Sequence, residues 1–161
     1  MLYFAYGSNL DYTRMYSRCK SAEVYGKAEL KGYKLVFMEN NSGRIVANLV
    51  KAEGETTPGM IYDLSDSDIT VLDKFEGYPF VYGREFVAVE CRGKMVKCVT
   101  YIMAEEYTFS TKYATNTITR GYGTPKREYF TFLLNGYTMF NLPQRKLLEA
   151  YEYSRDKGES L

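Results

Sequence analysis

The sequence predicts an α+β fold in one domain, built on a closed or half-closed antiparallel sheet with helices around it. Three observations support this fold class. Alternating or continuous apolar segments typical of strands occur through most of the first hundred residues, and segments with helix signals lie between and after them. The aromatic residues are 17 Tyr and 9 Phe with no Trp, a set that suits a β-rich core. The 161 residues are enough for one core, and we expect residues 156–161 to be a frayed tail.

A strand is expected over residues 1–5, followed by a sharp turn at residues 7–9, Gly-Ser-Asn. Asp11 then suits the N-cap of a short helix that ends near Arg18. A strand–turn–helix junction presents several backbone N–H groups towards one point, where a carboxylate or a developing oxyanion can be held. The same residues also fit a plain turn with an N-cap, which is the more frequent use of such a sequence.

Strands separated by turns are expected next. The alternation over residues 22–38 predicts two strands or one long, bulged strand. A turn at 40–43 precedes a strand over 45–51, a second turn is expected at 53–55, and a further strand starts or bulges at Pro58.

A helix is predicted from Ser65 to about Glu76. Ser65 suits the N-cap, and Asp68 occupies the capping-box position three residues later. The helix should end at Gly77, because glycine favours the C′ position and Pro79 prevents continuation. Three apolar side chains spaced three apart are expected to share the inward face: Ile69, Leu72 and Phe75.

Residues 81–91 and 95–103 alternate as the two strands of a hairpin. The polar, threonine-rich segment 104–122 has little periodicity, and we interpret it as a long surface loop or lid. Two final helices are expected over residues 125–137 and from 144 to about 155.

Composition excludes several functional classes. The formal charge of +1 gives no basic surface for nucleic acid or an anionic membrane, and no apolar run is long enough to span a bilayer. No secretory signal is present, so we expect a cytoplasmic protein. Three cysteines without a C-x-x-C motif predict neither a disulfide framework nor a zinc site. Because the sequence has no histidine, acid–base chemistry must use Asp, Glu, Lys, Tyr or Cys.

Glu76 is the carboxylate with the most unusual surroundings. It lies at the expected helix end, between Phe75 and the aromatic run 77–82. Aromatic surroundings remove water from a carboxyl and raise its pKa towards neutrality, so that Glu76 could accept a proton near pH 7 and return it. The alternative is a solvated glutamate before a turn. The carboxylates at residues 39, 53, 85 and 90 fit surface positions.

Two segments carry a resemblance to a known family. Residues 4–10, Phe-Ala-Tyr-Gly-Ser-Asn-Leu, resemble the opening motif of the gamma-glutamylcyclotransferases. Residues 72–79, Leu-Asp-Lys-Phe-Glu-Gly-Tyr-Pro, are similar to the segment that carries the catalytic glutamate of that family. The resemblance extends over most of the chain, but outside these two segments it mostly repeats core patterning.

The resemblance implies a small mixed β-barrel with peripheral helices and cyclisation of a gamma-glutamyl group to 5-oxoproline, with release of an amine. It implies that Glu76 is the proton shuttle and that no metal or cofactor is needed. The partner would be a small gamma-glutamyl compound, and a homodimer interface would suit the many tyrosines. The residues implied to bind substrate are Tyr6, Gly7, Ser8, Asn9, Leu10, Tyr82 and Tyr129.

Two departures leave the leaving amine open: Gly83 replaces a bulkier polar residue, and residues 104–124 match nothing familiar. Two other functional classes fit part of the sequence. A non-catalytic module that binds glutamyl compounds would use the same pocket. A phosphate-binding enzyme would use residues 7–9, but no G-x-x-x-x-G-K-[ST] motif follows.

Overall fold

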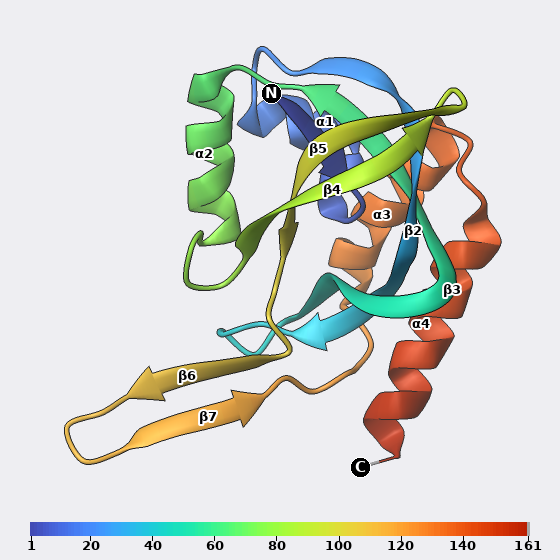
Figure 1. The fold of residues 1–161 in the computed structure, drawn as a ribbon. Helices are drawn as coiled ribbons and strands as arrows, with labels where there is room; N and C mark the ends of the chain where they lie inside the picture. The colour runs from blue at the N-terminus through green and yellow to red at the C-terminus, as the bar shows by residue number, and fades with distance from the viewer. Residues whose placement is uncertain (161) are drawn as a thin grey trace.

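A computed structural model describes residues 1–160 and shows a closed barrel with helices packed around its outside (Figure 1). The strands are neighbours in the order β1-β3-β2-β4-β5, and the barrel closes where β1 pairs with β5. This confirms the α+β barrel, with one difference from the expected antiparallel sheet: the closing pair β1·β5 is parallel. The strands are β1 Leu2–Ala5, β2 Glu23–Glu39, β3 Ile45–Asp63, β4 Gly83–Cys91 and β5 Lys94–Ile102.

The two long strands β2 and β3 pair antiparallel along most of their length. The strand β2 is continuous with register shifts, which confirms the long, bulged strand among the two alternatives. The expected turn at 53–55 is wrong, because β3 runs unbroken through it. Thr56 pairs with Lys31 and Lys51 pairs with Tyr33, so the extra residues of β3 form a bulge that bends the ribbon.

The first two helices match their sequence signals. Helix α1 (Tyr12–Arg18) is capped by the Asp11 carboxylate, which accepts a hydrogen bond from the backbone N–H of Arg14. Helix α2 (Asp66–Glu76) is capped by Ser65, whose hydroxyl accepts from the N–H of Asp68. At Gly77 the chain turns into the left-handed region with a φ of 67°, which ends the helix beside Glu76.

One expectation for α2 is wrong. Ile69 and Leu72 are buried as predicted, but Phe75 is 57% exposed. Phe75 lies in the last turn of α2 and faces α1, where the guanidinium of Arg18 lies over its ring at 4.4 Å. The spacing of three therefore identified two core positions and one contact between helices.

The hairpin β4–β5 is confirmed, but the loop expected over 104–122 is wrong. This segment forms a second hairpin, β6 (Glu106–Ser110) paired with β7 (Thr115–Thr119), which projects away from the barrel (Figure 1). Nearly all of its residues are exposed on both faces, so no apolar face marks the strands in the sequence. Threonine nevertheless favours extended backbone, which is the signal that the loop interpretation overlooked.

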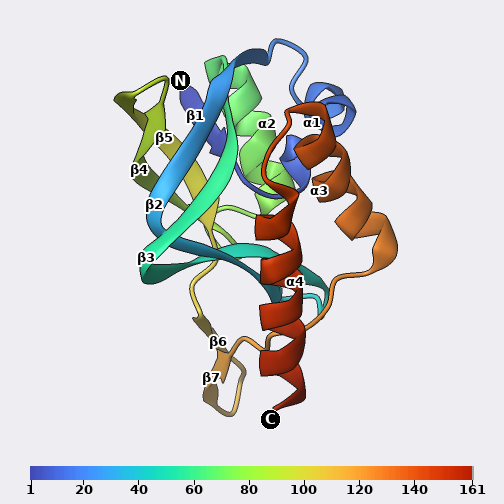
Figure 2. The ribbon, with the colours of Figure 1, turned by 90° about the vertical axis from the view of Figure 1, so that its right-hand side faces the viewer.

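The last two helices, α3 (Arg127–Met139) and α4 (Gln144–Glu159), lie along one side of the barrel (Figure 2). The frayed tail expected from residue 156 is wrong as far as residue 159, and Leu161 lies outside the described residues. The last turn of α4 has a partner: Lys157 lies over the ring of Tyr122, and Gly158 packs against the Tyr122 backbone. None of the helices in residues 1–160 is long and apolar enough to cross a membrane.

A short 3₁₀ turn, Ser8–Leu10, joins β1 to α1 and packs against α3. The contact depends on Gly136, where an added Cβ would lie 2.3 Å from Leu10 Cβ and 2.7 Å from the Leu10 carbonyl oxygen. The side chain of Leu10, the last residue of the turn, is fully buried in the core. Gly136 therefore allows the helix to approach the turn closely enough to fix its position.

We expect Gly136→Ala to lower the free energy of unfolding by roughly 1–3 kcal/mol, because its methyl group must displace the turn or the helix. Chemical denaturation measures this change. Gly83→Ala is the matched control, since its added Cβ would come no closer than 3.7 Å to another residue. Equal stability of the two variants would show that Gly136 does not set the position of the turn.

Candidate functional site

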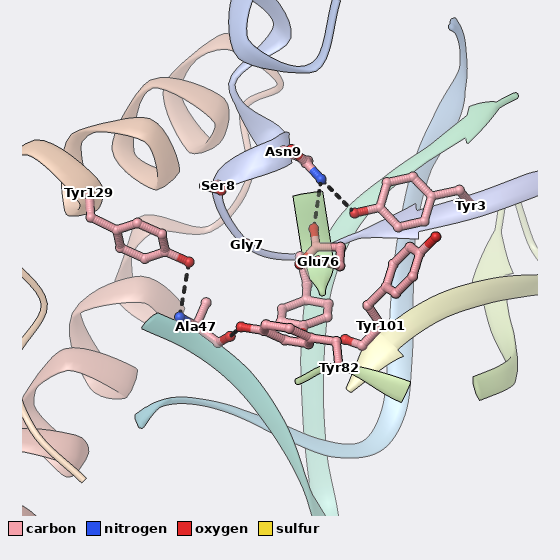
Figure 3. A pocket seen from close by; sticks show the side chains of 10 residues that line it. Tyr3, Gly7, Ser8, Asn9, Ala47, Glu76, Tyr82, Tyr101 and Tyr129 are labelled. Atoms are coloured by element: carbon pink, nitrogen blue, oxygen red, sulfur yellow. Dashed lines mark hydrogen bonds between the residues drawn. The ribbon is translucent and has the colours of Figure 1, made fainter. Parts of the chain in front are cut away.

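A pocket of about 300 Å³, its open mouth included, lies between the turn after β1, the end of α2 and the inner wall of the barrel (Figure 3). Of the residues predicted for the site, Leu10 alone does not line it, because its side chain belongs to the core. The pocket is lined by Tyr3, Tyr6, Gly7, Ser8, Asn9, Ala47, Glu76, Tyr82, Tyr101 and Tyr129.

Glu76 and the turn meet in this pocket although they are far apart in sequence. The Asn9 side chain donates a hydrogen bond from Nδ2 to Glu76 Oε1 at 3.3 Å (Figure 3). Helix α2 ends at Glu76 and the chain turns at Gly77, so the carboxyl lies at the helix end, within reach of the Asn9 side chain. The structure therefore brings the acid and the turn together in one pocket.

Burial raises the pKa of Glu76 from 4.5 to about 7. Arg18, Arg14 and the Asn9 hydrogen bond all lower this pKa, but they do not offset the loss of water. Among residues 1–160, Glu76 is the only charged side chain lining the pocket. The same part of the chain contains no group of three or more Cys, Asp or Glu side chains able to hold a metal ion. A carboxyl with a pKa of about 7 can take up and release a proton at neutral pH.

The turn supplies unused hydrogen-bond donors. The N–H groups of Leu10 and Asp11 bond to the carbonyls of Gly7 and Ser8 and so close the turn. Within residues 1–160, the N–H groups of Gly7, Ser8 and Asn9 donate to no protein acceptor. Such donors at the start of a helical turn suit a carboxylate or an oxyanion.

Five tyrosines line the pocket, but their hydroxyl groups have different partners. Tyr6 donates to the carbonyl of Tyr101 at 2.5 Å, Tyr82 to the carbonyl of Ala47 at 2.7 Å, and Tyr101 to Asp73 Oδ1 at 2.6 Å. Each of these three hydroxyl hydrogens is donated to a protein acceptor, so these tyrosines stabilise the wall of the pocket.

Tyr3 and Tyr129 differ from the other three because their hydroxyl oxygens accept hydrogen bonds. Tyr3 accepts from Asn9 Nδ2 at 3.0 Å, and Tyr129 accepts from the N–H of Ala47 at 3.0 Å. Neither hydroxyl hydrogen has an acceptor among residues 1–160. Burial holds both pKa values above the usual value, with that of Tyr129 at about 12. Both phenols are therefore neutral donors available to a ligand.

Sequence reasoning missed three lining residues: Tyr3, Ala47 and Tyr101. Ala47 contributes its backbone to Tyr82 and Tyr129, which leaves no signal in a side-chain pattern. Tyr3 lies in a strand assigned to the core, because the period of two places it on the same face as the fully buried Ala5. The available signal for Tyr3 was its phenol hydroxyl, directly before the motif at residues 4–10.

The family model for gamma-glutamyl cyclotransferase, AIG2-like proteins matches residues 3–129. Human gamma-glutamylcyclotransferase is 32% identical over 114 aligned positions, covering 63% of this chain and 58% of the human protein. The mouse gamma-glutamylcyclotransferase is 29% identical over 172 aligned positions, covering 98% of this chain and 82% of that protein. A solved gamma-glutamyl cyclotransferase structure superposes with a TM-score of 0.76 at 25% identity, covering 93% of this chain and 85% of that one. The match thus spans little more than half the length of the human relative.

Proposed function

The chain belongs to the gamma-glutamyl cyclotransferase, AIG2-like family, and from that premise we propose that it converts a gamma-glutamyl amine to 5-oxoproline and a free amine. The observation that carries the proposal is the pairing of Glu76, with its pKa of about 7, with the free N–H groups of the turn in one pocket. A proton shuttle and an oxyanion site are the two elements that such an acyl transfer needs. No co-reactant is consumed.

The first step is removal of a proton from the substrate. The α-amino group of a glutamyl compound is largely protonated at neutral pH and cannot attack as an ammonium ion. Glu76 is partly ionised near pH 7, so its carboxylate can accept that proton. The freed amine then attacks the γ-carbonyl carbon of the same molecule, and the pocket supplies the rate advantage of proximity by holding the chain folded.

The attack places negative charge on the γ-carbonyl oxygen. The N–H groups of residues 7–9 lie on the turn beside Glu76, together with the free hydroxyl hydrogens of Tyr3 and Tyr129. These donors can stabilise either this oxyanion or the α-carboxylate of the glutamyl group. When the C–N bond to the leaving amine breaks, protonated Glu76 returns its proton to that amine. The carboxylate formed in this way takes the second proton from the ring nitrogen and passes it to the departing amine or to water, so that the neutral five-membered lactam remains.

The pocket fits the glutamyl end of a substrate better than a whole polymer, because its lining encloses only a small volume. The leaving amine would extend through the open mouth. Free amino acids, dipeptides, polyamines and lysine side chains are the classes of leaving amine to compare.

A panel of gamma-glutamyl compounds from these classes tests the function. We expect at least one to give 5-oxoproline and free amine in equal amounts, measured by mass spectrometry, while the matching α-glutamyl compound gives neither. Saturable binding across the panel without turnover over hours would contradict the enzyme and favour a binding module.

A further inference from the structure

Two arginines of α1 lie next to the pocket without lining it. Arg14 donates from Nε to Ser8 Oγ at 3.2 Å, and Arg18 donates from Nη1 to Asn9 Oδ1 at 2.9 Å. Each guanidinium also lies over an aromatic ring, that of Arg18 at 4.4 Å from the ring centre of Phe75. Stacking and a hydrogen bond together hold the Arg18 side chain in one place.

The side chain of Asn9 has no hydrogen left for a substrate. Its Oδ1 accepts from Arg18, and the two hydrogens of its Nδ2 serve Tyr3 Oη and Glu76 Oε1. Asn9 is only 3% exposed. Because a guanidinium carries no acceptor, the carboxamide oxygen must face Arg18, and its NH₂ group must then face Glu76. Arg18 therefore determines which end of the carboxamide the carboxyl of Glu76 meets.

We propose that Arg18 and Asn9 are a positioning pair for Glu76, in which Arg18 fixes the Asn9 carboxamide and Asn9 fixes the carboxyl of Glu76. The proposal rests on the cyclotransferase function and revises the expected role of Asn9. Its backbone N–H is left free for substrate, while its side chain orients the acid and the Tyr3 hydroxyl.

The charges around Glu76 predict how the pair affects titration. The positive groups facing it are Arg18 and Arg14 of α1, and both lower its pKa. The other titratable groups facing it are neutral phenols from β1, the turn, the loop after α2, β5 and α3: Tyr3, Tyr6, Tyr82, Tyr101 and Tyr129. Removing the charge of Arg18 must raise the pKa of Glu76 above its value of about 7.

Arg18→Gln and Arg18→Lys separate position from charge. For Arg18→Gln we expect kcat to fall about 10- to 100-fold, since small misplacements of a catalytic group have effects of this size. KM should change by less than about threefold, because Arg18 lies outside the pocket lining. The acidic limb of the kcat profile should move to higher pH.

Arg18→Lys keeps the charge, so its acidic limb should stay in place while kcat still falls. Lys20→Gln removes a charge two residues away and should leave kcat, KM and the pH profile unchanged.

A measurement without substrate distinguishes this proposal from the function on which it rests. In protein labelled with ¹³C-glutamate, the Glu76 carboxyl signal, assigned through its loss in Glu76→Gln, is titrated in folded wild type and variants. We expect a higher midpoint in Arg18→Gln than in wild type. If the midpoint is higher but no compound of the panel is turned over, the positioning pair would be supported and the proposed enzymatic function contradicted.

A wild-type kcat, pH profile and carboxyl midpoint in Arg18→Gln would overturn the positioning pair and leave the function standing. So would a rise in KM at constant kcat, which would make Arg18 a substrate ligand. If Arg18→Gln does not fold by circular dichroism, Arg18→Lys decides alone. Wild-type kcat in Arg18→Lys would then overturn the proposal.

Discussion

Glu76→Gln should reduce kcat for 5-oxoproline release by about 10²–10⁴-fold, the usual contribution of a positioned acid–base group. The amide keeps the shape of the side chain, and its oxygen can still accept the hydrogen bond that Asn9 Nδ2 donates. It cannot take a proton from the substrate ammonium. The rate is measured with the best substrate of the panel. Substrate affinity, measured by calorimetry, should change far less than kcat.

Glu85→Gln is the control for this substitution, because Glu85 is an exposed acid on β4 away from the pocket. It should release 5-oxoproline at the wild-type rate. If Glu76→Gln also turned over at near the wild-type rate, the proton shuttle would have to be another group, and the proposed mechanism would be wrong.

The parts of this site that could be predicted from sequence are those fixed by local signals. Ser65 and Gly77 set the two ends of α2, and this alone places Glu76 at a helix end among aromatic residues. The Gly-Ser-Asn turn is likewise set by its own residues. Both segments could be predicted because, within about ten residues, each contains the signals that begin and end its local structure together with the group that does the chemistry.

The parts that could not be predicted depend on contacts between distant segments. Asn9 was expected to bind substrate with the rest of its motif, and this stays a prediction; its side-chain partners come from β1, α1 and α2, which no local signal indicates. The turn expected at 53–55 is a bulge within β3: residues 52–55 have no partner on β2 and Gly54 has a φ of 80°, while the pairs on either side keep β3 a single strand. In both cases, contacts between distant segments decide the outcome.

The raised pKa of Glu76 also has a consequence for stability. Its folded pKa of about 7 lies above the ordinary 4.5, so the folded protein binds the proton more tightly than the unfolded chain. The stabilising contribution of the protonated form is complete below pH 4.5 and is lost as the pH rises through 7. At about 1.4 kcal/mol per pH unit, ionisation of Glu76 lowers the free energy of unfolding by about 3 kcal/mol at pH 8.

Glu76→Gln cannot ionise, so we expect it to escape this loss. Between pH 4.5 and pH 8, its free energy of unfolding should rise by about 3 kcal/mol relative to wild type, or roughly 6–12 °C in Tm. Urea denaturation of both proteins at a series of pH values measures the difference, and Glu85→Gln should follow the wild-type curve throughout. Parallel curves for wild type and Glu76→Gln would mean that the carboxyl is well solvated in the folded protein. A variant that is less active but more stable above pH 7 would instead show that the pocket keeps this acid poorly hydrated at a cost to the fold.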